Sequence, residues 1–139
     1  MQIITPSERD FKEICRLIEQ FELDNRSLEA GQFLIAADDN EMNGFGRIRK
    51  HDTCSELCSL GVVEPRRHKG IGSQLVKELT DKVTGPLYLV CIIPDFFEPL
   101  GFSVVKVYPP EIQDKLEYCI SALSVPEPYV VMKYQKNSA

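Results

Sequence analysis

The sequence has no apolar run that approaches the roughly 18 residues needed to cross a bilayer. Its start, Met-Gln-Ile-Ile-Thr-Pro-Ser-Glu-Arg-Asp, lacks the basic region and the cleavage site of a signal peptide. Internal repeats, linkers and low-complexity tracts are missing too. We therefore expect a cytoplasmic protein without a membrane partner, folded as one domain over residues 1–139.

An excess of positive charge is also missing. The chain carries 16 Lys and Arg residues against 21 Asp and Glu residues, which gives a formal net charge of -5 and a pI of about 5.1. The field of such a molecule repels a polyanion rather than attracting it. We therefore expect no nucleic-acid partner.

The five cysteines lack the paired C-x-x-C spacing of a zinc site. Because they are odd in number and scattered along apolar segments, we interpret them as buried free thiols. A metal cluster of His51, Cys54 and Cys58 is conceivable, but the sequence offers no evident fourth ligand. We therefore expect no metal.

What the chain does contain is an alternation of strand patterns and amphipathic helix patterns. Its 139 residues are 43% hydrophobic and 27% charged, as in a soluble globular domain with a single core. Ser7, with Asp10 three residues later, predicts the start of a first helix, and further helices are expected over 71–83, from Pro94 and after Pro110. Strands are expected at 1–5, 32–37, 45–50, 53–63, 87–93, 102–107 and 129–134.

This order of elements predicts an α/β fold with a mixed central sheet of six to seven strands and helices on both faces. Residues 38–44 are rich in turn formers and predict a turn. Residues 23–31 are polar and irregular, which makes them a candidate for a mobile flap over a site. Ideal alternation along 53–63 places Glu56 on one face with Cys54 and Leu60.

A basic loop interrupts this pattern at residues 64–75, which read Glu-Pro-Arg-Arg-His-Lys-Gly-Ile-Gly-Ser-Gln-Leu. A strand that passes through a glycine loop into a helix directs several unpaired backbone N–H groups at one point, and a phosphate suits that point. The loop lacks the Gly-Lys-Ser/Thr ending of a nucleotide triphosphate loop. It also has Leu75 where the dinucleotide fingerprint requires a small residue.

The loop resembles a third pattern instead. Arg-His-Lys-Gly-Ile-Gly at residues 67–72 fits the Arg/Gln-x-x-Gly-x-Gly/Ala signature of the GCN5-related N-acetyltransferases, the GNAT superfamily, which transfers acetyl groups from acetyl-CoA to amines. The strand before the loop, the helix after it and Asp-Phe-Phe-Glu-Pro-Leu-Gly-Phe at 95–102 are similar to that superfamily in the same order. The resemblance extends over roughly residues 45–107 and implies a single GNAT domain with acetyl-CoA as cosubstrate.

The resemblance also implies which residues bind the coenzyme. Backbone amides of residues 67–73 would bind its pyrophosphate, the strand at 60–63 would pair with its pantetheine arm, and Phe97 would pack against that arm. The implied coenzyme residues are Leu60, Val62, Val63, Arg67, His68, Lys69, Gly70, Ile71, Gly72, Ser73 and Phe97. The alternative is a solvated basic turn before an ordinary helix.

Glu56 is the candidate catalytic residue, because attack on the thioester requires a neutral amine and a carboxylate can remove the proton of the ammonium. Desolvation among apolar strand positions would raise its pKa towards a useful value. In histone- and glutamate-acetylating members of the superfamily a glutamate at the corresponding place is that base. An ion-paired strand residue that bridges Arg47 or Arg49 stays open as the other interpretation.

The sequence departs from the superfamily at Phe97, where a tyrosine often protonates the departing thiolate. A substitute such as Tyr88, Cys91 or Tyr108, release of the thiolate to water, and slow turnover all stay open. A noncatalytic acyl-CoA-binding module is therefore the alternative function. Coenzyme A thiolate, with a thiol pKa of about 8.5, is a tolerable leaving group, so we expect activity.

The acceptor is the least defined partner. Ser-Glu-Leu-Cys-Ser-Leu-Gly-Val at residues 55–62 is similar to a strand of the acetyltransferase domain of N-acetylglutamate synthase, and Arg26 matches an arginine that would hold a substrate carboxylate there. Where that family has hydroxyl residues and an arginine, the strand here has Val90, Cys91, Ile92 and Ile93. An amino acid, another small primary amine, and a protein lysine or N-terminus stay open. A homodimer paired through a protruding last strand is also open.

Overall fold

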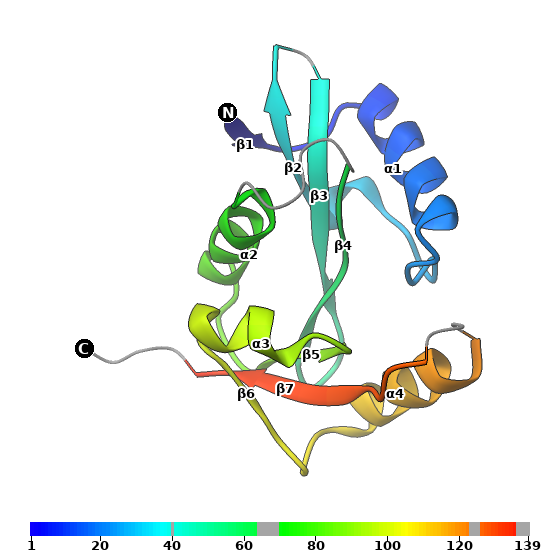
Figure 1. Ribbon diagram of the computed structural model, residues 1–139, viewed down its shortest axis with the longest axis vertical. Helices are drawn as coiled ribbons and strands as arrows, with labels where there is room; N and C mark the ends of the chain where they lie inside the picture. Colours follow the sequence, from blue (N-terminus) through cyan, green and yellow to red (C-terminus); the bar gives the residue numbers. More distant parts are fainter. Residues whose placement is uncertain (40, 64–69, 123–125, 136–139) are drawn as a thin grey trace. The chain divides into compact units, whose positions relative to one another are not determined.

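The computed structural model of the protein describes residues 1–39, 41–63, 70–122 and 126–135. Within these ranges seven strands form one mixed sheet in the order β1-β2-β3-β4-β5-β7-β6 (Figure 1). β4 and β5 are parallel, while β1 and β2, β2 and β3, β5 and β7, and β6 and β7 are antiparallel. The predicted α/β fold with a mixed sheet of six to seven strands is therefore confirmed.

The elements follow one another along the chain as the sequence predicts. The strands are β1 (Gln2–Ile4), β2 (Phe33–Asp38), β3 (Glu41–Lys50), β4 (Ser55–Val62), β5 (Leu87–Cys91), β6 (Phe102–Val104) and β7 (Val130–Tyr134). The helices are α1 (Glu8–Gln20), α2 (Ile71–Asp81), α3 (Pro94–Phe97) and α4 (Pro110–Ala122), with short 3₁₀ turns η1 (Ala30–Gln32) and η3 (Glu98–Leu100). No helix in the described ranges is long and apolar enough to cross a membrane.

The start of α1 shows how the local sequence determines an element. The Ser7 hydroxyl accepts a bond of 3.1 Å from the Asp10 amide, and the Asp10 carboxylate accepts one of 2.9 Å from the Ser7 amide. This reciprocal capping box satisfies two of the amides that a helix start leaves unpaired, and such a cap is worth about 1 kcal/mol. The predicted cap is confirmed.

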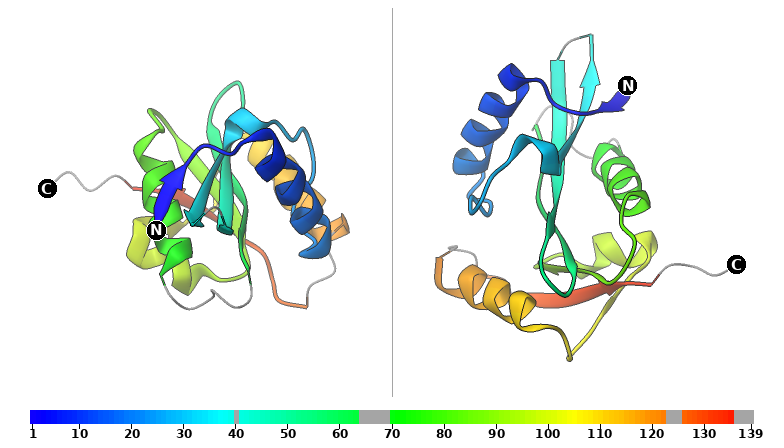
Figure 2. Two further views of the ribbon diagram at one scale, coloured as in Figure 1. Left: turned by 90° about the horizontal axis from the view of Figure 1, so that it is seen from above. Right: turned by 180° about the vertical axis from the view of Figure 1, so that it is seen from behind.

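The contacts between residues divide the chain into two compact units, and the single domain over 1–139 stays a prediction. The first unit comprises Met1–Arg49 and Leu57–Lys82, and in it α1 and α2 cover opposite faces of the strands β2 to β4 (Figures 1 and 2). On the α2 face the strands approach the helix closely. A Cβ added at Gly46 would lie only 3.0 Å from the Leu79 side chain. The core on the α1 face consists of Ile14, Leu17, Ile18, Phe33, Ile35 and Phe45.

The second unit comprises Lys50–Glu56 and Val83–Ala139. Its sheet begins with the parallel pairing of Glu56 on β4 with Tyr88 on β5 and continues through β7 to β6. Helix α4 packs on β5 and β7 over a buried cluster that contains Cys54, Tyr88, Ile112 and Val131. This unit therefore carries Glu56 at the start of β4, next to the hairpin turn and to α4.

Several boundaries differ from the sequence prediction. β3 begins at Glu41, inside the predicted turn, because the pairs Ala37 with Met42 and Asp38 with Glu41 extend the hairpin almost to its tip. The β4 residues 56–59 are all buried, so burial does not alternate along this part of the strand, and the predicted common face of Glu56, Cys54 and Leu60 stays a prediction. The prediction of a protruding last strand is wrong, since β7 lies between β5 and β6 and pairs with both. The homodimer itself stays a prediction.

Candidate active site

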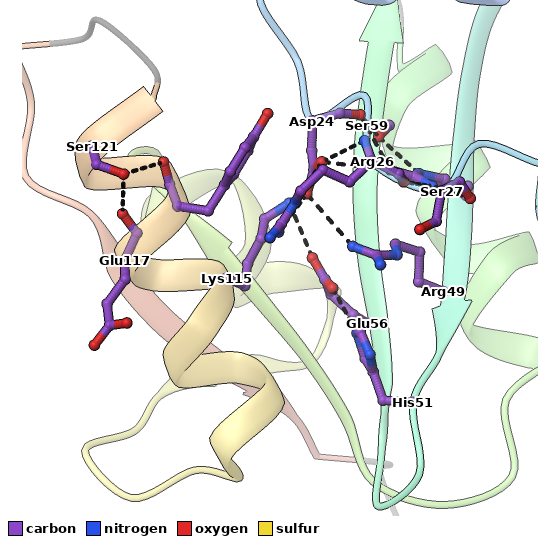
Figure 3. A network of polar contacts seen from close by, with 12 residues as sticks. Asp24, Arg26, Ser27, Arg49, His51, Glu56, Ser59, Lys115, Glu117 and Ser121 are labelled. Carbon is purple, nitrogen blue, oxygen red and sulfur yellow. Dashed lines mark hydrogen bonds and ion pairs between the residues drawn. The ribbon is translucent and has the colours of Figure 1, made fainter.

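Glu56 lies in the second unit between two basic side chains (Figure 3). Its side chain is fully buried, its Oε1 is 2.9 Å from His51 Nε2, and its Oε2 is 3.0 Å from Lys115 Nζ. The ammonium is nearly as buried, with 5% of the Lys115 side chain exposed, whereas 16% of the His51 side chain is exposed. Buried charges are tolerated only when they are paired, so each member of this group requires the others.

The hairpin between β3 and β4 positions His51. The His51 amide donates to the Cys54 carbonyl at 2.8 Å, which closes the turn and places the ring beside the first residues of β4. The turn is also bound to the start of α4, because the Thr53 amide and hydroxyl donate to the Glu111 carboxylate at 3.1 and 3.0 Å. The bond from its own backbone amide and those from Thr53 hold the pKa of Glu111 below its ordinary value.

Helix α4 positions Lys115, which lies one turn after Glu111 on the same helix. One helix therefore contributes an acceptor for the hairpin and an ammonium for Glu56. The resulting geometry has a carboxylate at its centre, an ammonium that favours the ionised carboxylate, and a ring nitrogen whose donor or acceptor role depends on the tautomer. Such a group can hold or pass a proton.

The sequence located Glu56 but not its partners. Glu56 was expected among apolar neighbours, or paired with Arg47 or Arg49, and the structure places His51 and Lys115 beside it. Arg47 instead donates from Nε to the Ser59 hydroxyl at 2.9 Å. No local sequence signal relates Lys115 to Glu56, since the two meet only because α4 packs on β5, which pairs with β4.

The predicted phosphate loop is described only at its end. Arg67, His68 and Lys69 lie outside the described residues. Gly70 has φ of 79°, a left-handed conformation that favours glycine, and α2 begins at the following residue, Ile71. In the described residues no side chain caps this helix, so the first amides of α2, which include those of Gly72 and Ser73, form an N-terminus of the kind that binds anions.

The other predicted coenzyme residues lie in the two units separately. Leu60, Val62 and Val63 are half-buried on β4 and directly after it in the first unit, where the Val63 amide donates to the Asn43 carbonyl at 2.9 Å. Phe97 is buried in the second unit and packs edge to face on Phe102, with ring centroids 5.8 Å apart. A backbone hydrogen bond of Val63 and aromatic packing of Phe97 are therefore established, while contact with a coenzyme stays a prediction.

Three residues, Tyr88, Cys91 and Tyr108, could replace the tyrosine that is missing at Phe97, and they differ in their surroundings. Burial raises the pKa of the Cys91 thiol, whose sulfur lies 3.7 Å from that of Met132. Tyr88 is buried with Lys133 Nζ over its ring at 5.6 Å, whereas Tyr108 is half-buried. Cys91 is thus a weak acid in an apolar setting.

Arg26 lies in the first unit, where Asp24 holds it. Its Nε and Nη2 donate to the two Asp24 carboxylate oxygens at 3.1 and 3.0 Å, and 34% of its side chain is exposed (Figure 3). Arg47 and Arg49 each place a nitrogen 3.8 Å from the same carboxylate. The sequence suggested Arg26 as a substrate ligand but did not indicate that three arginines share the Asp24 carboxylate.

The cysteines and acidic residues show no metal site in the part of the chain that the structure describes. No group of three or more His, Cys, Asp and Glu side chains there is arranged to hold a metal ion. The His51 ring, which the sequence offered as a conceivable ligand, is instead at hydrogen-bond distance from Glu56.

Comparison with known proteins gives a family match over most of the chain. The model of the Acetyltransferase (GNAT) family matches residues 1–102. No curated protein matches the sequence significantly.

Several solved structures share the fold. N-acetylglutamate synthase from Neisseria gonorrhoeae, in complex with coenzyme A and N-acetyl-glutamate, is 17% identical with a TM-score of 0.75, over 96% of this chain and 34% of that one. Rv2747 from Mycobacterium tuberculosis, in complex with CoA, is 15% identical with a TM-score of 0.74, over 96% and 98%. Naa50 from Arabidopsis thaliana, in complex with a bisubstrate analogue, is 15% identical with a TM-score of 0.65, over 96% and 97%. This chain thus spans about a third of the synthase chain.

Proposed function

The chain belongs to the acetyltransferase (GNAT) family, whose enzymes take their acetyl group from acetyl-CoA, and we propose that it transfers this group to the primary amine of a small molecule, with Glu56 as general base. The observation that carries the proposal is the fully buried Glu56 carboxylate between His51 and Lys115. A carboxylate withdrawn from water and held in one geometry suits proton transfer.

The start of α2 supports acetyl-CoA binding. The resemblance assigns residues 67–73 to the pyrophosphate, and the left-handed Gly70 brings the chain into the uncapped helix start. A Cβ at Gly70 would meet no atom within 4 Å in the described structure, so its conformation rather than packing requires glycine. The family matched and the coenzyme complexes among the structural neighbours support binding of acetyl-CoA.

The reaction needs three proton movements. The acceptor ammonium gives its first proton to Glu56, directly or through a water, and the neutral nitrogen then attacks the thioester carbonyl carbon to form a tetrahedral intermediate. The carbon–sulfur bond breaks, the nitrogen loses its second proton to solvent as the neutral amide forms, and the departing thiolate takes up a proton.

For that last proton we favour solvent water over Cys91, with the hydroxyls of Tyr88 and Tyr108 as the other sources that stay open. Burial raises the pKa of the Cys91 thiol, which makes it a poor donor to a thiolate whose conjugate acid has a pKa of about 8.5. Phe97 has no proton to give. The same absence of a tyrosine favours the second candidate function, a domain that binds acyl-CoA but turns over slowly.

For the acceptor we favour an amino acid. Arg26 presents a guanidinium that is one-third exposed and anchored by Asp24, which suits the carboxylate of such a substrate. The neighbours include an enzyme bound to N-acetyl-glutamate and one bound to a peptide-like bisubstrate analogue, so a protein N-terminus or lysine is the rival acceptor. A cytoplasmic location and a homodimer complete the proposal.

Calorimetric titration with acetyl-CoA, followed by a thiol-release assay with a panel of amines, tests the proposal. We expect micromolar binding, on the order of -8 kcal/mol, and steady release with at least one amino acid. Binding without release for any amine would select the acyl-CoA-binding module. Absence of binding, with ATP and NAD as controls, would reject the coenzyme site.

A further inference from the structure

One guanidinium in the first unit holds a whole segment of chain. Arg47 on β3 is fully buried, and each of its nitrogens donates at least one hydrogen bond. Most of these bonds reach the segment that the sequence suggested as a mobile flap. The acceptors are the carbonyls of Asp24 at 3.1 Å, Arg26 at 3.0 Å and Ser27 at 3.4 Å, Gln32 Oε1 at 2.9 Å and Ser59 Oγ at 2.9 Å.

Two of these acceptors belong to residues in an uncommon backbone conformation. Ser27 has φ of 53° and Ser59 has φ of 52°, in the left-handed region where residues other than glycine are strained. The Ser59 hydroxyl, besides accepting from Arg47, donates to the Asp24 carbonyl at 2.8 Å. Strain of this kind persists only where neighbouring contacts determine it, and it gathers at functional sites.

The same contacts join two parts of the proposed site. The segment at 24–27 contains Arg26, the proposed acceptor ligand, and Ser59 directly precedes Leu60, which the resemblance assigns to the pantetheine arm. Asp24 completes the connection, because its carbonyl accepts from both Arg47 and Ser59 while its carboxylate holds Arg26. All of these residues lie in one unit.

We infer that Arg47 is a positioning residue for the acceptor. Its guanidinium fixes residues 24–27 against β4. It thereby fixes the position of Arg26, the proposed acceptor ligand, relative to the strand that the resemblance assigns to the coenzyme. The role in acceptor binding rests on the proposed function. A buried arginine is a costly way to hold a loop, since an apolar side chain of similar volume often gives equal stability. What the guanidinium adds is geometry, because its donors point in fixed directions and hold several carbonyls in one arrangement.

Ser59→Ala is the first test, because it removes the hydroxyl that bridges Arg47 and Asp24 but leaves the guanidinium in place. We expect faster amide hydrogen exchange over residues 24–32 and an acceptor KM raised about ten-fold, because the variant loses both buried hydrogen bonds of this hydroxyl, with acetyl-CoA affinity nearly unchanged. Arg47→Lys retains the charge but not the fork of donors, and we expect a larger effect of the same kind.

Two matched variants serve as controls. Ser103→Ala removes an exposed hydroxyl from β6 and should change neither measurement. Ser27→Gly relieves the left-handed strain but retains the carbonyl that Arg47 binds, so exchange over 24–32 should stay slow.

The outcomes separate the inference from the proposed function. Unchanged exchange in Ser59→Ala and in Arg47→Lys would overturn the inference whatever the activity of the wild type. Faster exchange with an unchanged acceptor KM would reduce Arg47 to a structural role and overturn its part in acceptor binding. A wild type that releases no thiol with any amine would reject the proposed function and, with it, the acceptor role, while the exchange data would still decide whether Arg47 fixes the segment.

Discussion

Lys115 Nζ lies 3.0 Å from Glu56 Oε2, and at most 5% of either side chain reaches solvent. Removing one partner of a buried ion pair leaves the other charged without compensation, which typically costs about 3–5 kcal/mol. We therefore expect Lys115→Met to lower the free energy of unfolding by several times the effect of Lys77→Met, which removes an exposed ammonium from α2. Urea unfolding curves of both variants measure this. Equal effects would mean that the pair contributes little to the folded state.

The Glu56 carboxylate is expected to act in the chemical step and not in coenzyme binding. Glu56→Gln retains the shape of the side chain but cannot take up a proton, so acetylation should fall by about 10²- to 10⁴-fold. Acetyl-CoA affinity, measured by calorimetry, should be little affected. Glu78→Gln, at an exposed position of α2, is the control. A rate equal to wild type at every pH would remove Glu56 from the mechanism.

Gly70 is expected to be required for binding of the coenzyme pyrophosphate. Its φ of 79° is strained for any residue with a Cβ, and Gly70→Asp also brings a carboxylate to the start of α2. We expect acetyl-CoA binding to be lost in Gly70→Asp and weakened in Gly70→Ala. Gly31→Ala, where a Cβ would likewise meet no atom within 4 Å, is the matched control. Retained affinity in Gly70→Asp would show that the pyrophosphate lies elsewhere.

The bond between the hairpin turn and α4 should depend on pH. The pKa of Glu111 is lowered by its own backbone amide and by Thr53, so its contribution to stability is present above the ordinary glutamate pKa of about 4.3. It is lost as pH falls through the lowered value in the folded state. Glu111→Gln should therefore be less stable than wild type at pH 7, and the difference should vanish in acid. A difference that is constant with pH would assign the effect to packing.

The parts of the fold that the sequence predicted are those that local chemistry determines. Ser7 and Asp10 lie three residues apart and form the cap that their spacing indicates, and the expected helix begins at Pro94. In contrast, the left-handed Ser59 lies within a strand whose residue types gave no sign of it. Its conformation is determined by Arg47 and Asp24, which are distant in sequence.

The candidate site divides in the same way. Glu56 and the glycine loop could be found from a strand pattern and a motif, because both are contiguous in sequence. His51 and Lys115 could not, since a single residue in a turn and a single lysine on a helix carry no pattern. They become partners of Glu56 only through the pairing of β4 with β5 and the packing of α4 on β5.

The two outermost strands of the sheet, β1 and β6, are each three residues long. An open strand edge is a template on which a foreign or misfolded chain can add by backbone pairing, and short edges limit the number of bonds that such an intruder can form. The longer strands β3 and β4 lie inside the sheet rather than at its edges. The strand order therefore places short strands at both edges, and a change that detached β1 would uncover the six-residue strand β2 as a new edge.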